Sequence, residues 1–217
     1  MRPAGIVGGA GVTFHPRGLR PRTPSSLAPT APLIDHLDES RRGLAALAGK
    51  LGQIERWGAL LRRRLEDGGR LLVAGNGGSA ALAHHLAGEL VGRYDRERRP
   101  FSALALSAET AGLTAIGNDY GFDQCFARQV EAHGRPGDVL LALSTSGASV
   151  NLLRAVDAAR GAGVEAWAMT GPAPNPLAGA VDDVLTVDCA GTPSVQDVQQ
   201  VAVHLLCLAF ELAGSPS

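Results

Sequence analysis

Apolar residues recur along the chain in two patterns. Between residues 35 and 65, Leu, Ile and Trp return every three or four positions, which is typical of one apolar face of a long helix. A break is predicted near Gly49, and Gly68 and Gly69 end the pattern. Short continuous apolar runs follow at 70–75, 101–106, 138–143, 164–169 and 184–187. Such runs are typical of strands buried on both faces of a parallel sheet.

Helical patterns separate these runs, at 79–91, 123–132, 149–160 and 194–212. Regular alternation of strands and helices predicts an α/β fold, in which a doubly wound five-stranded parallel sheet is flanked by helices. Ligands bind such sheets at the carboxyl ends of the strands. The segments that follow the strands are therefore the first candidates for a functional site.

The first 34 residues differ from the rest. They are rich in Pro and Gly, contain four Arg and no acidic residue, and have no helical or strand period. Such a segment cannot offset the entropy of ordering, so we predict a disordered extension at 1–34 and a folded domain at 35–213. A signal peptide is a weaker interpretation, because the run at 5–14 is short, Gly-rich and lacks a clean cleavage pattern. Another interpretation is that the start codon has been assigned too far upstream.

Composition excludes several classes of function. The 217 residues carry 20 basic and 21 acidic side chains, which argues against a strongly cationic nucleic-acid binder. No stretch approaches about 20 uninterrupted apolar residues, so no membrane span is predicted. The three Cys are far apart and odd in number, which fits neither a disulfide framework nor a CxxC metal site and favours a cytoplasmic location.

Two of the loops after strands suit an anion. The first, GNGGS at 75–79, opens a helix, and its glycines let backbone N–H groups approach a ligand. A tight turn needed only for packing is an equal alternative. The other, STSGAS at 144–149, places four hydroxyls at a helix start, a pattern that favours a phosphate monoester. One of these hydroxyls can be a plain helix cap.

Polar side chains elsewhere are weaker candidates. Asn118 and Asp119 lie in a Gly-flanked segment, GNDYGF at 117–122, for which an Asx-turn is slightly favoured over hydrogen bonding to sugar hydroxyls. His85 and Glu89 are four residues apart on one helix face, and Gln196 and His204 are about two turns apart on another helix. These four can form a zinc or acid–base site, or they can be a surface pair and hydrogen-bonded core residues.

Taken together, the motifs resemble a known family. GNGGS (75–79), HHLAGEL (84–90) followed by GRY, GNDYGF (117–122), GDVLLALSTSGAS (137–149) and TPSVQ…H (192–204) occur in the order of the phosphoheptose isomerases of the sugar isomerase (SIS) superfamily. The resemblance runs from about residue 35 to 212. It implies a SIS fold, a homotetramer with active sites at subunit interfaces, and interconversion of sedoheptulose 7-phosphate and D-glycero-D-manno-heptose 7-phosphate.

The resemblance also implies roles for individual residues. One zinc ion per subunit is expected on His85, Glu89, Gln196 and His204, of which Glu89 and Gln196 also meet the substrate. Glu89 and His204 are the expected catalytic base and acid. The remaining substrate contacts are expected from two loops and from the GNDYGF segment: Asn76, Gly77, Gly78, Ser144, Thr145, Ser146, Ser149, Asn118 and Asp119.

Alternatives within the superfamily stay open. A non-catalytic SIS adaptor that associates with a replication initiator is one, but the presence of Glu89 and His204 favours an enzyme. A sugar-phosphate sensor is another, although residues 1–34 are too Pro-rich for a helix-turn-helix domain. An isomerase for a shorter ketose phosphate is a third. The chain departs from the family at Ser194 and Asp197, where Arg and Glu are usual.

Overall fold

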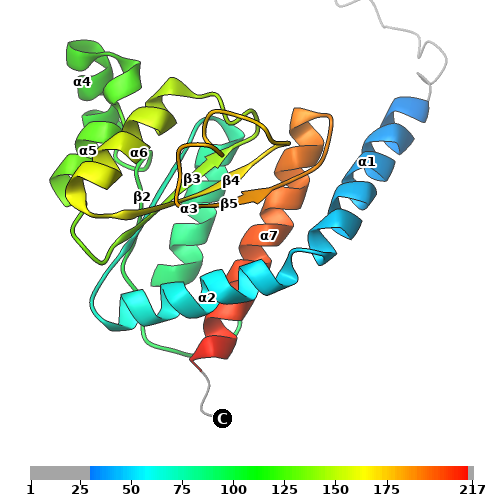
Figure 1. Cartoon of the computed structure of the whole chain (residues 1–217), viewed down its shortest axis with the longest axis horizontal. Helices are drawn as coiled ribbons and strands as arrows, with labels where there is room; N and C mark the ends of the chain where they lie inside the picture. The colour runs from blue at the N-terminus through cyan, green and yellow to red at the C-terminus, as the bar shows by residue number, and fades with distance from the viewer. Residues whose placement is uncertain (1–29, 215–217) are drawn as a thin grey trace, which may run out of the picture.

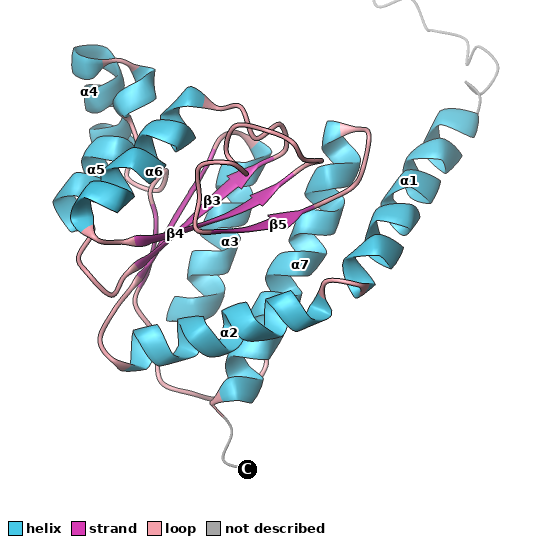
Figure 2. Cartoon of the chain, viewed as in Figure 1, coloured by secondary structure: helices cyan, strands magenta, loops and turns pink. Residues whose placement is uncertain are grey.

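The five apolar runs form a single parallel sheet, with strand order β2-β1-β3-β4-β5. The computed structural model describes residues 30–214. Leu71 of β1 lies beside Ala103 of β2 on one side and Val139 of β3 on the other. The predicted doubly wound five-stranded sheet is confirmed (Figure 2). The strands are β1 Leu71–Gly75, β2 Ala103–Ala105, β3 Val139–Ser144, β4 Glu165–Thr170 and β5 Asp183–Thr186.

Helices cover both faces of the sheet and form two separate cores. On one face, α1, α2, α3 and α7 pack against side chains such as Leu71, Leu141 and Met169. On the other face, α5 and α6 pack against alternate residues such as Leu72 and Leu140 (Figure 1). The helices are α1 Ala31–Ala48, α2 Leu51–Glu66, α3 Gly78–Val91, α4 Thr110–Tyr120, α5 Ala127–His133, α6 Val150–Ala162 and α7 Thr192–Ala213, with a 3-10 turn η1 Phe122–Gln124.

The N-terminal helix begins earlier than predicted. Helix α1 starts at Ala31, so the predicted domain boundary after residue 34 falls inside it. The physical reason is Pro32, which occupies the first turn, where proline's fixed φ suits a helix and its missing N–H costs nothing. The predicted break near Gly49 is confirmed, since α1 ends at Ala48 and α2 begins at Leu51. The rest of the predicted extension, residues 1–29, lies outside the described residues.

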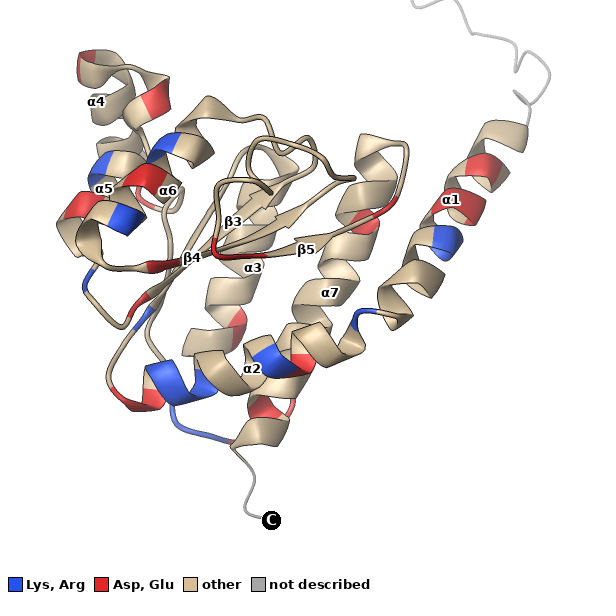
Figure 3. Cartoon of the chain, viewed as in Figure 1, with Lys and Arg blue, Asp and Glu red and all other residues tan. Residues whose placement is uncertain are grey.

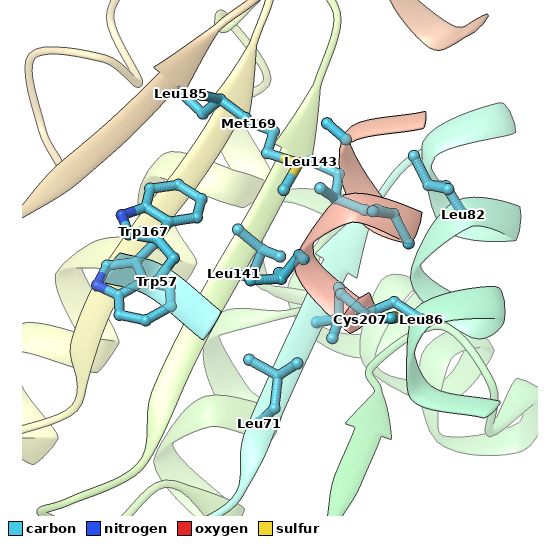
Figure 4. Packing of buried hydrophobic residues seen from close by; sticks show 14 of the residues in the cluster. Trp57, Leu71, Leu82, Leu86, Leu141, Leu143, Trp167, Met169, Leu185 and Cys207 are labelled. Carbon is cyan, nitrogen blue, oxygen red and sulfur yellow. The ribbon is translucent and has the colours of Figure 1, made fainter. Parts of the chain in front are cut away.

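Packing on the α3/α7 face positions the helices that carry the candidate ligands. Trp57 of α2 and Trp167 of β4 stack with ring centroids 4.8 Å apart (Figure 4). The Trp57 indole Nε1 donates to Asp183 Oδ2 at 2.7 Å, which satisfies its buried N–H. Leu86 of α3 and Cys207 of α7 are both buried in this core. Because α3 and α7 pack on the same face of the sheet, polar side chains that border this core on the two helices lie close to one another.

The segment that contains Asn118 and Asp119 is a helix and not the predicted turn. Both residues lie in the last turn of α4, a helix with no buried residue. Its N-cap is Glu109, whose carboxylate accepts hydrogen bonds from the N–H groups of Ala111 and Gly112. A helix that buries no face has no apolar period, which is why the pattern did not reveal it. No helix in the described part of the chain is long and apolar enough to span a membrane.

Candidate active site

The loops after β1 and β3 meet where the strand order reverses. Since β2 lies on one side of β1 and β3 on the other, the chain leaves these two strands in opposite directions and opens a crevice between them. Asn76, directly after β1, exchanges two hydrogen bonds of 3.0 and 2.9 Å with the buried amide of Asn151 in α6. Sequence reasoning missed Asn151; its only signal was its place just after the hydroxyl-rich loop.

The hydroxyl-rich loop divides into a structural and an accessible part. Ser144 is buried, and its Oγ accepts a hydrogen bond from the Gly147 N–H at 3.0 Å, so this hydroxyl shapes the turn. Ser146 is exposed, and Thr145 and Ser149 are half-buried. Ser149 is the N-cap residue of α6, and its side chain makes no capping hydrogen bond. Ser146 Oγ accepts a hydrogen bond from the Ala148 N–H at 3.2 Å and can still donate its own O–H. Three hydroxyl donors thus lie beside a helix N-terminus, an arrangement that suits an anion.

No formal positive charge lies in either loop. Residues 75–79 and 144–149 contain no Lys or Arg, and Figure 3 shows the loops at this end of the sheet without basic residues. Arg62–Arg64 lie near the far end of α2 instead. Gly77 caps α3 with a φ of 55°, a backbone conformation that favours glycine. The N–H groups of Ser79 and Ala80 donate to the carbonyl oxygens of Asn76 and Gly77, each at 3.0 Å, so this turn is closed by its own backbone.

Three candidate ligand atoms converge between α3 and α7. His85 Nε2 lies 2.8 Å from His204 Nε2 and 3.4 Å from Glu89 Oε1. The ligand atoms of His85, Glu89 and His204 all lie within 4.8 Å of one another, and all three side chains are half-buried. The structure therefore brings together three of the four predicted metal residues. Two imidazoles and one carboxylate are a donor set that catalytic zinc sites use.

Two further side chains contact His204. The Gln200 amide Nε2 lies 3.1 Å from His204 Nε2, and the Tyr94 ring centroid lies 5.6 Å from that of His204. Sequence reasoning assigned neither residue to the site. Gln200 carried a signal, its spacing of four residues from His204 on one helix. Tyr94 belongs to the GRY motif that follows HHLAGEL, but nothing in the sequence places it beside His204, because its loop and α7 are far apart in the sequence.

The fourth predicted ligand, Gln196, lies toward the anion loop. Gly78, His85, Gln196 and Gln200 line one pocket. A Cβ added at Gly78 would lie 2.6 Å from Gln196 Nε2, so the amide packs directly on the first residue of α3. Gln196 thus stands between the GNGGS loop and the His85 imidazole. Its role as a metal ligand stays a prediction.

The two departures from the family share one partner. Asp197 Oδ2 lies 2.9 Å from His36 Nε2 and accepts a hydrogen bond from Ser40 Oγ at 2.8 Å. Ser194 Oγ lies 3.2 Å from the other ring nitrogen of His36. Ser194 and Asp197 therefore fasten the start of α7, on either side of Gln196, to helix α1.

The predicted sugar contacts Asn118 and Asp119 lie elsewhere in the chain. Asn118 Nδ2 donates to Asp119 Oδ1 at 2.8 Å, and both side chains are on the surface. Their helix α4 lies at a corner of the molecule beyond α5 and α6, apart from α7 (Figure 1). The structure of the single chain does not bring Asn118 and Asp119 to His204.

Comparison with known proteins agrees with the fold. A sequence profile of the SIS domain matches residues 35–171. Phosphoheptose isomerase from Streptomyces coelicolor is 57% identical over 182 residues, which are 84% of this chain and 79% of that protein. Among solved structures, phosphoheptose isomerase GmhA from Neisseria gonorrhoeae has a TM-score of 0.77 at 36% identity, with 84% of this chain and 98% of that chain covered.

A second solved structure, a phosphoheptose isomerase from Francisella tularensis, has a TM-score of 0.79 at 34% identity and covers 84% of this chain and 97% of that chain. Each of these two solved structures is covered almost completely, together with 84% of this chain. The resemblance read from the motifs is confirmed. The chain belongs to the SIS-domain family and, within it, to the phosphoheptose isomerases, so it is an isomerase.

Proposed function

We propose that the chain interconverts sedoheptulose 7-phosphate and D-glycero-D-manno-heptose 7-phosphate. The observation that carries the proposal is the convergence of His85, Glu89 and His204 beside a loop of neutral phosphate donors. An aldose–ketose exchange needs a base, an acid and an anchor for the distal phosphate, and these groups supply all three.

The phosphate is bound by neutral groups. Thr145, Ser146 and Ser149 offer hydroxyls, and backbone N–H groups at the starts of α3 and α6 add donors and a favourable helix dipole. Asn76 and Gly77 shape the opposite wall of this cradle. Because such contacts are the same in the bound substrate and in the transition state, they serve affinity more than rate.

Glu89 and His204 move the protons. The Glu89 carboxylate takes a proton from C1 of the ketose while His204 gives one to the carbonyl oxygen at C2, and a cis-enediol results. Glu89 then returns its proton to C2, and His204 accepts the hydroxyl proton from O1, which leaves an aldehyde at C1. Both side chains approach the same ring nitrogen of His85, Nε2, so His85 keeps them in register.

The residues present fit a zinc ion. His85 Nε2 and His204 Nε2 face each other, and a second nitrogen, that of Gln200, faces His204 as well. One imidazole nitrogen has a single lone pair or a single N–H, so this crowding of nitrogens suits a shared cation better than hydrogen bonds. His85, Glu89, Gln196 and His204 would hold it. A zinc ion bound there would polarise the substrate carbonyl and the developing enediolate oxygen.

The assembly proposed is a homotetramer in the cytoplasm. Helix α1 exposes Leu33, Ile34 and Leu37 by 68%, 52% and 67%, and this apolar row suits a neighbouring subunit. Active sites at subunit interfaces would also explain the position of Asn118 and Asp119, which would then contact the substrate in the active site of a neighbouring subunit. The three buried cysteines are free, which is consistent with a reducing compartment.

Kinetics of matched variants test the assignment. Glu89→Gln and His204→Gln should each lower kcat by about 100-fold or more, because each removes a proton-transfer group. Glu55→Gln, on the exposed face of α2, should leave kcat unchanged. Ser146→Ala should raise KM and spare kcat. Near-normal kcat in either His204→Gln or Glu89→Gln would defeat the assignment of that residue.

A further inference from the structure

A buried carboxylate near the end of α7 organises the loop after α3. The Glu211 side chain is only 2% exposed. It accepts hydrogen bonds from the backbone N–H groups of Tyr94, Asp95 and Arg96 at 3.2, 3.3 and 3.1 Å. Burial alone would raise the pKa of Glu211, but these three N–H groups and Arg98 outweigh it and hold the pKa below its usual value. Glu211 is therefore a charged anchor for this loop.

Arg98 connects that anchor to the end of α3. Its Nε lies 3.4 Å from Glu211 Oε1, and the side chain is 8% exposed. The guanidinium donates to the carbonyl oxygens of Glu89 at 2.6 Å, Leu90 at 2.9 Å and Gly92 at 3.2 Å. The last carbonyls of a helix have no partner within the helix, so Arg98 closes the C-terminal end of α3.

The same loop carries the ring that packs on His204. Tyr94 donates its N–H to Glu211, and its side chain lies against the His204 imidazole at a tilt of 44°. Glu211 is seven residues after His204 on α7, which is about two turns. One buried ion pair thus reaches both candidate catalytic residues, Glu89 through its carbonyl and His204 through Tyr94.

We propose that Glu211 and Arg98 are positioning residues that hold the Glu89 carboxylate and the His204 imidazole in register. The inference rests on the proposed function of these two groups. Groups that orient a metal ligand without touching the metal typically change metal affinity or activity by about 10–100-fold when they are removed. A side chain that only stabilised the fold would change neither in the folded protein.

The chain offers a matched control just before β3, where a buried carboxylate pairs with Arg70 and Arg135 and not with residues of α3 or α7. Asp138, at the start of β3, has a side chain that is 3% exposed and lies 3.4 Å from Arg70 Nε. It accepts backbone hydrogen bonds from Arg70 at 2.9 Å and Arg135 at 3.0 Å. Asp138 therefore has the same chemistry as Glu211, a buried carboxylate paired with Arg and held by backbone N–H groups, away from the candidate site.

The test compares Glu211→Gln with Asp138→Asn in the full chain. Each amide keeps one acceptor oxygen, removes a charge and turns an NH₂ toward backbone donors, so both variants should melt at lower temperature. At a temperature where both are folded, Glu211→Gln should lower kcat about 10–100-fold with a smaller change in KM, and it should weaken Zn²⁺ binding about 10-fold by calorimetry. Asp138→Asn should keep the wild-type kcat, KM and Zn²⁺ affinity.

Each outcome has one meaning. Equal kcat and equal Zn²⁺ affinity in the two folded variants would overturn the positioning role. If the wild-type protein shows no turnover, and Glu211→Gln but not Asp138→Asn binds Zn²⁺ more weakly than the wild type, the positioning role is supported and the proposed function is refuted. If Glu211→Gln does not fold, Arg98→Lys takes its place, since it keeps the charge beside Glu211 but cannot span three carbonyls. Wild-type kinetics and Zn²⁺ affinity in Arg98→Lys would likewise overturn the role.

Discussion

A methyl group added at Gly78 should disturb the site without disturbing the fold. Gly78 is the first residue of α3 and has no left-handed φ, so alanine fits its backbone. The new Cβ would lie 2.6 Å from Gln196 Nε2 and 2.8 Å from Gln196 Oε1. Ordinary contact begins near 3.4 Å, so the amide must retreat by roughly 0.8 Å.

The size of the expected effect on stability and on rate depends on which group is displaced. The displaced group is the end of a flexible side chain, and alanine is favoured over glycine in a helix by up to about 1 kcal/mol, so the melting temperature should hold or rise slightly. A displacement of about 1 Å in a site can cost about 100-fold in rate. We expect Gly78→Ala to lower kcat/KM for the heptose phosphate by about 10–100-fold.

The assay is steady-state turnover together with a thermal melt, and Gly88→Ala is the control. Gly88 lies on the same helix, and an added Cβ there would meet nothing within 4 Å. The control should keep kcat/KM within about twofold and gain stability. A Gly78→Ala protein with wild-type kcat/KM would refute the reasoning, because Gln196 would then have no part in the site.

Three further predictions concern stability and reactivity. Gly58→Ala should lower the free energy of unfolding by about 1–3 kcal/mol and the melting temperature by several degrees, because its Cβ would lie 2.6 Å from Ala209 Cβ. Gly52→Ala on the same helix, where an added Cβ meets nothing within 4 Å, should cause no such loss. Equal melting temperatures of the two variants would contradict this packing. Burial raises the pKa of Cys207 to about 12, so Ellman's reagent should label it only after unfolding, and rapid labelling of the native protein would contradict its burial. The pKa of Glu211 lies below its usual 4.5, so its contribution to stability is present above that pH and is lost as the pH falls through the lower folded pKa. Urea midpoints of wild type and Glu211→Gln should therefore converge in acid, and a constant difference would be the contrary result.

The sheet could be predicted from local patterns, whereas the grouping of His85, Glu89 and His204 rests on the family resemblance. Strands buried on both faces, such as Leu71–Gly75, give continuous apolar runs. His85 and Glu89 share a helix face through a spacing of four residues, and their convergence with His204 required only that α3 and α7 pack on one side of the sheet. The topology supplied that packing.

What could not be predicted depends on partners distant in the sequence or on helices that bury nothing. Helix α4 has no buried residue, so the segment with Asn118 and Asp119 had no apolar period. Asn151 and Tyr94 owe their places to Asn76 and His204, on other elements. The start of α1 differs from the prediction because Pro32 adds to a Pro-rich composition that favours disorder, whereas in the structure it occupies the first helical turn.

The most direct measurement is conversion of sedoheptulose 7-phosphate in D₂O, followed by NMR, with Zn²⁺ and with a chelator. The account predicts an aldoheptose 7-phosphate that carries deuterium at C2, because the Glu89 carboxyl group exchanges its proton with solvent before returning it. It also predicts that the chelator abolishes the conversion and that Glu89→Gln does not support it. A protein that binds the phosphosugar yet forms no aldose, with Zn²⁺ present, would contradict the central claim.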